Sequence, residues 1–119
     1  LIHPGLIERA VTAARKDRAV ITALPAKETV KKIDKDGLVI KTCDRRQVWL
    51  VQTPQVFRYE DIIMAHQRAV QEGWDAVTDD ALLVEKMGIP VKVIEGSEDN
   101  IKVTTPHDME LARFLLSRE

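Results

Sequence analysis

Residues 19–25, Ala-Val-Ile-Thr-Ala-Leu-Pro, carry the pattern that decides the fold class. The run is apolar apart from Thr22, and Pro25 breaks it. A short continuous apolar run favours a strand that is buried on both faces, as in a parallel sheet. The preceding segment has helical periodicity instead, with apolar residues after Pro4 at Leu6, Ile7, Ala10, Val11 and Ala14. A helix followed by a buried strand indicates an α/β protein.

The same alternation continues toward the carboxyl terminus. Residues 48–51 predict a second buried strand, which Thr53-Pro54-Gln55 ends. A helix follows from about Tyr59 to Gln71, and Gly73 stops it. The remaining predicted elements are a helix capped by the hydroxyl of Thr78, a strand at 91–95, a very short extended segment at 101–103, and a last helix opened by Thr105 and Pro106.

These elements predict an α/β domain with a mostly parallel sheet. Ligands of such sheets bind outside the carboxyl ends of the strands. We therefore expect chemistry at residues 25–29, at residues 53–55 and at the turn that places Lys102.

Residues 28–43 depart from this plan. Two β-rich runs, 29–33 and 38–42, flank Asp34-Lys35-Asp36-Gly37, and Asp-Gly between such runs is a strong hairpin signal. A two-stranded hairpin is marginally stable alone in water. We expect this hairpin to be an arm that lies against its own domain or a second subunit.

Length and composition exclude several classes of protein. The 119 residues suffice for one domain, and the 45% hydrophobic and 31% charged content is typical of a globular protein. A formal net charge of −1 does not support a nucleic-acid partner. Cys43 is the only cysteine, which rules out an intrachain disulfide and suggests an apolar filler. No apolar run is long enough to span a bilayer, so we expect no membrane partner and a cytoplasmic, reducing location.

Two cations are candidates for binding an anion. Lys102 precedes a helix start whose free amides favour anions, but a lysine between apolar neighbours more often points to solvent from an edge strand. Arg45 offers a planar fork of donors that matches phosphate oxygens. Alternatively it forms a surface ion pair with Asp44, or it lies with Arg46 in a solvated turn.

Other polar residues give weaker signals. Thr29, Thr53 and Thr78 could each donate a hydroxyl to a phosphate or polyol, or serve as turn and cap residues. The three histidines lack metal-ligand spacing and are interpreted as structural. Asp79 and Asp80 are interpreted as helix-start acids rather than as a metal pair. The residues alone predict an α/β domain with a possible anion site near Lys102.

Three strings of residues, in order along the chain, carry a family resemblance. They are Asp44-Arg45 with Trp49 and Gln52-Thr53-Pro54-Gln55-Val56-Phe57, then Val77-Thr78-Asp79-Asp80-Ala81, then Glu95-Gly96 with Asp99-Asn100-Ile101-Lys102-Val103-Thr104-Thr105-Pro106. Together they resemble the signatures of the 2-C-methyl-D-erythritol 4-phosphate cytidylyltransferases. Enzymes that load ribitol 5-phosphate share much of this pattern, so the acceptor is less certain than the reaction.

The resemblance implies a Rossmann-like nucleotide-diphospho-sugar transferase fold, of which residues 1–119 are the carboxy-terminal half, and a homodimer joined by the arm at 28–43. It implies transfer of CMP from CTP to a sugar-alcohol phosphate in non-mevalonate isoprenoid synthesis. By position, Arg45 and Lys102 look like the residues that place the acceptor's phosphate. Thr29, Thr53 and Thr78 look like substrate contacts, with Thr29 and Arg45 serving the other subunit's site.

The resemblance also implies Mg²⁺, with ligands in an amino-terminal half that precedes Leu1 in the family together with the CTP loop. No metal or nucleotide ligand is therefore expected within these 119 residues, and the chain alone is expected to be inactive. Two alternatives stay open. One is a ribitol-5-phosphate cytidylyltransferase, and the other is a noncatalytic dimerisation or anion-binding module.

Overall fold

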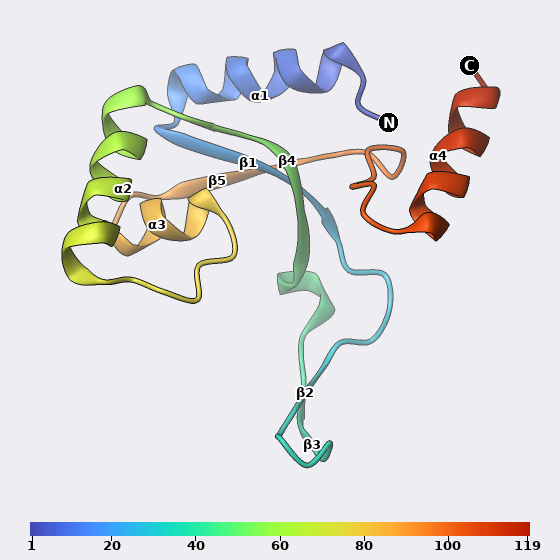
Figure 1. The fold of residues 1–119 in the computed structure, drawn as a ribbon, viewed down its shortest axis with the longest axis horizontal. Coiled ribbons are helices and arrows are strands. Elements are labelled where there is room, and N and C mark those ends of the chain that lie inside the picture. Colours follow the sequence, from blue (N-terminus) through green and yellow to red (C-terminus); the bar gives the residue numbers. More distant parts are fainter.

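Three strands form the central sheet of the structure, a computed structural model that describes residues 1–119. β1 (Ala19–Pro25) lies between β4 (Trp49–Phe57) and β5 (Val91–Glu95), as Figure 1 shows. The first five residues of β1 are buried, which confirms the buried strand and the α/β class. β1 is parallel to β5 but antiparallel to β4, so the sheet in this chain is mixed rather than mostly parallel. The reason is the connection, because the projecting arm returns the chain alongside β1 in the opposite direction.

β4 is longer than the sequence predicts. It does not end at residues 53–55 but continues to Phe57. Its pairing with β1 shifts between Val51 and Gln55, so that three residues of β4 face the single residue Thr22. This is a β-bulge on the edge strand of the sheet, a place where a strand tolerates proline, and the Thr53–Pro54 peptide within it is cis. The buried Thr22 hydroxyl donates a hydrogen bond of 3.1 Å to the Pro54 carbonyl.

Four helices surround the sheet. They are α1 (Pro4–Lys16), α2 (Tyr59–Glu72), α3 (Asp80–Lys86) and α4 (Pro106–Ser117). α1 packs on β1 and β4 through Leu6 and Ala10, while α2 and α3 join Ala19 of β1 in one core cluster. Figure 1 shows α1 above the sheet, α2 and α3 at one end, and α4 at the other.

Helix ends follow the predicted capping chemistry with one exception. Gly73 ends α2 in the left-handed conformation at φ 66°, and Thr105 opens α4 with a capping box. The prediction that Thr78 caps α3 is wrong. Asp79 is the cap, because its Oδ1 accepts the Leu82 N–H at 2.9 Å and a carboxylate caps at least as well as a hydroxyl. Thr78 is left outside the helix.

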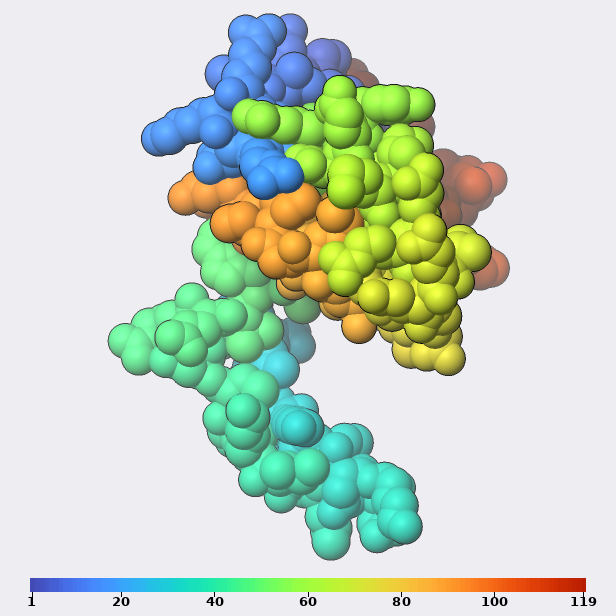
Figure 2. All heavy atoms as spheres, turned by 90° about the vertical axis from the view of Figure 1, so that its left-hand side faces the viewer, coloured from blue at the N-terminus to red at the C-terminus, as the bar shows by residue number.

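The hairpin is present as predicted, with β2 (Lys31–Ile33) paired antiparallel to β3 (Val39–Thr42). One Asp34 oxygen accepts the N–H groups of Asp36 and Leu38 at 2.9 and 3.0 Å, and Gly37 takes φ 83° in the turn. A 3-10 turn, η1 (Arg45–Gln47), joins the hairpin to β4. Figure 2 shows the arm extending well away from the rest of the molecule, and every residue of both strands is exposed.

No helix of the structure has the length and apolar character that crossing a membrane requires.

Candidate functional site

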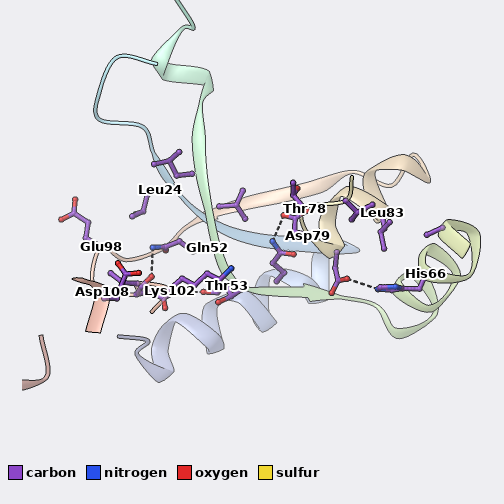
Figure 3. A pocket seen from close by; sticks show the side chains of 18 of the residues that line it. Leu24, Gln52, Thr53, His66, Thr78, Asp79, Leu83, Glu98, Lys102 and Asp108 are labelled. Atoms are coloured by element: carbon purple, nitrogen blue, oxygen red, sulfur yellow. Dashed lines mark hydrogen bonds and ion pairs between the residues drawn. The ribbon is translucent and has the colours of Figure 1, made fainter. Parts of the chain in front are cut away.

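One open cavity of about 1210 Å³ brings together three of the five predicted site residues, Thr53, Thr78 and Lys102. Thr53 comes from the bulge of β4, Thr78 from the turn before α3, and Lys102 from the segment after β5. Figure 3 shows Lys102 and Thr53 toward one end of the cavity and Thr78 toward the other. The expectation that residues 53–55 lie at a strand end is wrong, since the bulge presents them from within β4.

Lys102 is the cation of this cavity. Its residue is exposed, and its ammonium makes no ion pair in the structure. The predicted short strand at 101–103 is absent, because the chain there runs as irregular structure before α4. Lys102 therefore does not point outward from an edge strand. It lines the cavity as a free positive charge.

Side-chain amides hold the walls of the cavity together. Gln55 Nε2 donates to Asp79 Oδ2 at 3.0 Å and so ties β4 to the start of α3, next to Thr78. Asn100 Nδ2 donates to the carbonyl of Thr53, and Gln52 bonds the loop before Lys102. These residues are predicted from the sequence only as parts of motifs. For Gln52 and Gln55, an amide side chain within a largely apolar strand was the signal that could have identified them, whereas Asn100 lies in a loop and has no such signal.

The carboxylates around the cavity are already engaged by the protein. Asp80 lies 2.9 Å from His66 Nε2, and Glu98 pairs with Lys27. The backbone N–H of Thr104, together with the Thr105 and Thr104 side chains, lowers the pKa of Asp108 below its usual value. No group of three or more metal-ligating side chains lies together in the chain. The cavity therefore does not gather the several oxygen ligands that an all-protein Mg²⁺ site would use.

Thr29 and Arg45 do not reach the cavity within a single copy of the chain. Thr29 lines an adjacent hollow of about 530 Å³ at the base of the arm, and Arg45 lines neither space. The Arg45 guanidinium donates to the carbonyl of Lys27. The alternative ion pair between Asp44 and Arg45 is wrong, because Asp44 caps η1 and pairs with Arg46 at 2.8 Å. Arg45 thus keeps a charge that no carboxylate neutralises.

Comparison with known proteins gives a consistent result. A family model described as 2-C-methyl-D-erythritol 4-phosphate cytidylyltransferase matches residues 1–118. Proteins of that name from a Nostoc strain and from Pelotomaculum thermopropionicum are 45% and 48% identical to 98% of this chain. The chain covers 51% and 48% of their lengths, so it spans about half of these relatives.

Solved structures agree. The cytidylyltransferase of this name from Thermus thermophilus matches 97% of the chain at a TM-score of 0.85 and 33% identity, with 56% of that protein covered. The 4-diphosphocytidyl-2C-methyl-D-erythritol synthase from Anaerococcus prevotii matches 95% at 0.87 and 38% identity, with 52% covered. The expected nucleotidyltransferase fold is confirmed. From its matched residues and its fold, this chain belongs to the 2-C-methyl-D-erythritol 4-phosphate cytidylyltransferase family.

Proposed function

We propose that this chain forms the acceptor-binding half of a 2-C-methyl-D-erythritol 4-phosphate cytidylyltransferase. In the whole enzyme, CMP passes from CTP to the sugar-alcohol phosphate and pyrophosphate leaves. The observation that carries the proposal is the convergence of Thr53, Thr78 and Lys102 on one cavity in a chain of this family.

The role of the cavity follows from charge. A phosphate oxygen of the acceptor attacks the α-phosphorus of CTP, so two polyanions must meet and the barrier is largely electrostatic and positional. The unpaired ammonium of Lys102 offers the acceptor's phosphate a counter-charge, and the hydroxyls of Thr53 and Thr78 offer hydrogen bonds to the polyol. This chain would thus hold the attacking group in line while the nucleotide is bound elsewhere in the enzyme.

In a homodimer, Arg45 and Thr29 could contribute to the acceptor site of the second subunit. Four apolar side chains of the arm, Ile33, Leu38, Val39 and Ile40, are each more than half exposed, which favours a protein surface as their partner. An arm laid on a second copy could carry Arg45, whose charge no carboxylate satisfies, to that copy's acceptor site. Two cations from two subunits would then act on one phosphate.

Mg²⁺, when bound with CTP, would neutralise the nucleotide's phosphates. We assign it no ligand in this chain, because no group of three or more metal-ligating side chains lies together here. The cytoplasmic location stays a prediction.

Steady-state kinetics of the full-length protein that contains this chain test the proposal. Lys102→Ala and Arg45→Ala should each lower kcat/KM for the acceptor by about 30- to 1000-fold, which corresponds to about 2–4 kcal/mol of lost transition-state stabilisation. The KM for CTP should stay near its wild-type value. Lys92→Ala and Arg46→Ala are matched controls, since Lys92 is exposed on β5 away from the cavity and Arg46 is paired with Asp44. Equal changes in both KM values would refute the assigned roles.

Competition between acceptors tests the substrate. With 2-C-methyl-D-erythritol 4-phosphate and ribitol 5-phosphate present together, the first should be consumed preferentially. Preference for ribitol 5-phosphate would keep the reaction and replace the acceptor. A full-length protein that turns over neither would point to the noncatalytic anion-binding module.

A further inference from the structure

Gln52 uses its whole amide to hold the loop that precedes Lys102. Its Nε2 donates to the carbonyls of Ser97 and Asn100 at 2.8 and 3.0 Å, and its Oε1 accepts the Ser97 N–H at 3.2 Å. The three bonds join positions 45 to 48 residues apart in sequence. A half-buried amide with both of its ends satisfied fixes the two segments that it joins.

Gly96 provides the space that this amide occupies. A Cβ atom built on Gly96 would lie 2.1 Å from Gln52 Oε1, closer than any non-bonded contact permits. The Gly96 N–H donates to the Ala23 carbonyl at 2.9 Å, which fixes the glycine against β1. Its φ is not positive, so backbone conformation does not require glycine here. Glycine is required at position 96 because the Gln52 side chain approaches it so closely.

This arrangement matters for Lys102 because the lysine side chain makes no hydrogen bond or ion pair of its own, so its place depends on the backbone that precedes it. Lys102 has no ion pair, and its backbone is in irregular structure two residues after Asn100. The position of its ammonium relative to Thr53 therefore depends on how the loop at 96–100 is held against β4. Asn100 adds a second connection by donating to the Thr53 carbonyl. Gln52 and the Thr53 carbonyl thus hold the loop that precedes Lys102 against β4, the strand that carries the Thr53 hydroxyl.

We propose that Gln52, fitted against Gly96, is a positioning residue that sets the place of Lys102 in the acceptor site. The proposal rests on the function proposed above and adds residues that act through Lys102 rather than through the substrate. Loss of the Gln52 amide would leave three backbone groups of the loop without their partner and let the loop move. A displacement of about 1 Å at a reacting group can cost about 100-fold in rate.

A double-mutant cycle in the full-length protein tests this inference. Gln52→Ala and Gly96→Ala should each lower kcat/KM for the acceptor by about 10- to 100-fold, with the CTP KM unchanged. The double variant Gln52→Ala with Gly96→Ala should be no worse than the worse single variant, because the added methyl group no longer meets the amide. Gln67→Ala, on the exposed surface of α2, is the matched control and should behave as wild type.

The outcomes separate this inference from the proposed function. If Lys102→Ala lowers kcat/KM for the acceptor but Gln52→Ala does not, the positioning role is wrong and the proposed function stands. If Lys102→Ala also leaves kcat/KM for the acceptor unchanged, the proposed function itself is wrong. Additive losses in the double variant, or equal increases in both KM values with a collapsed melting temperature, would show that Gln52 and Gly96 serve only general stability.

Discussion

β1 and the arm are both rich in strand-forming residues, yet their environments are opposite. In β1, Ala19, Val20, Thr22 and Ala23 have no exposed surface. In the arm, Leu38 and Val39 are 66% and 56% exposed. Burial of a valine or leucine side chain is worth about 1.5–3 kcal/mol, which β1 gains within its own chain and the arm does not. The comparison shows that β propensity and turn chemistry can form a hairpin, whereas only burial makes a strand part of a stable core.

The same substitution, valine to aspartate, should have opposite effects on folding in the two regions. Val20→Asp places an unpaired charge in the middle of the buried strand and should cost about 4 kcal/mol or more, enough to prevent folding. Val39→Asp places the same charge where it can stay in water, so circular dichroism should show wild-type secondary structure. If the arm joins two subunits, sedimentation of Val39→Asp should show the monomer. A folded Val20→Asp protein, or an unfolded Val39→Asp protein, would contradict the contrast.

Two ion pairs give a second, smaller contrast. In the body, the Arg18 guanidinium holds Asp61 at 2.6 and 3.0 Å, and Asp61 is 7% exposed. At the base of the arm, Asp44 pairs with an exposed Arg46. Asp61→Asn should lower the free energy of unfolding by about 1–2 kcal/mol, allowing for the exposure of Arg18, while Asp44→Asn should leave it unchanged. Urea denaturation of the full-length protein at pH 7 measures both.

The effect at Asp61 should depend on pH. Hydrogen bonding from Arg18 lowers the pKa of Asp61 below its ordinary value of 3.8. A carboxyl whose pKa is lower in the folded state stabilises the protein above its unfolded pKa, and this contribution is lost as the pH falls through the folded value. The difference between wild type and Asp61→Asn should therefore be full at neutral pH and shrink below about pH 4. A constant difference down to about pH 2 would rule out this origin.

Two left-handed glycines give the smallest contrast. Gly73 ends α2 at φ 66° and Gly37 closes the arm's turn at φ 83°. Alanine at either position should carry about 1 kcal/mol of backbone strain. Gly73→Ala should lower the melting temperature, because the strain falls on a helix that packs on the core. Gly37→Ala should leave it unchanged and speed amide exchange in residues 31–42. Equal decreases in melting temperature for the two variants would mean that the arm unfolds together with the rest of the chain.

Local signals in the sequence predict the arm with its two strands, the four helices and the three strands of the central sheet. Asp34 and Gly37 form the predicted turn, and Thr105 and Pro106 open α4 as expected. Several local expectations failed, among them the short strand at 101–103, which is absent. Pro54 did not end β4, because a bulge opposite Thr22 accommodates it, and Thr78 lost the capping role to Asp79.

The candidate site was predictable only as a set of residue types. Family resemblance named Thr53, Thr78 and Lys102, and the fold brings them to one cavity. The amide of Gln52 within a largely apolar strand indicated a polar role, but no local pattern indicated that its partner would be the loop near Ser97 or that Gly96 would be needed there. Thr29 and Arg45 lie away from that cavity in a single copy, so their assigned roles rest on a second subunit.

Local sequence was enough to predict most elements whose hydrogen bonds close within about four residues, such as the arm's turn and the ends of α2 and α4, although it named the wrong cap for α3. It also predicted that β1 is buried, since an apolar run tends to leave water. The same reasoning was wrong for the second predicted buried strand at 48–51, because Trp49, Leu50 and Val51 in β4 are 38%, 60% and 49% exposed. Only the tertiary structure decided the direction of β4, the bulge, and the connection from Gln52 to the Lys102 loop. These depend on partners 32 and 45 residues apart in sequence, whose pairing is set by packing and not by any local pattern.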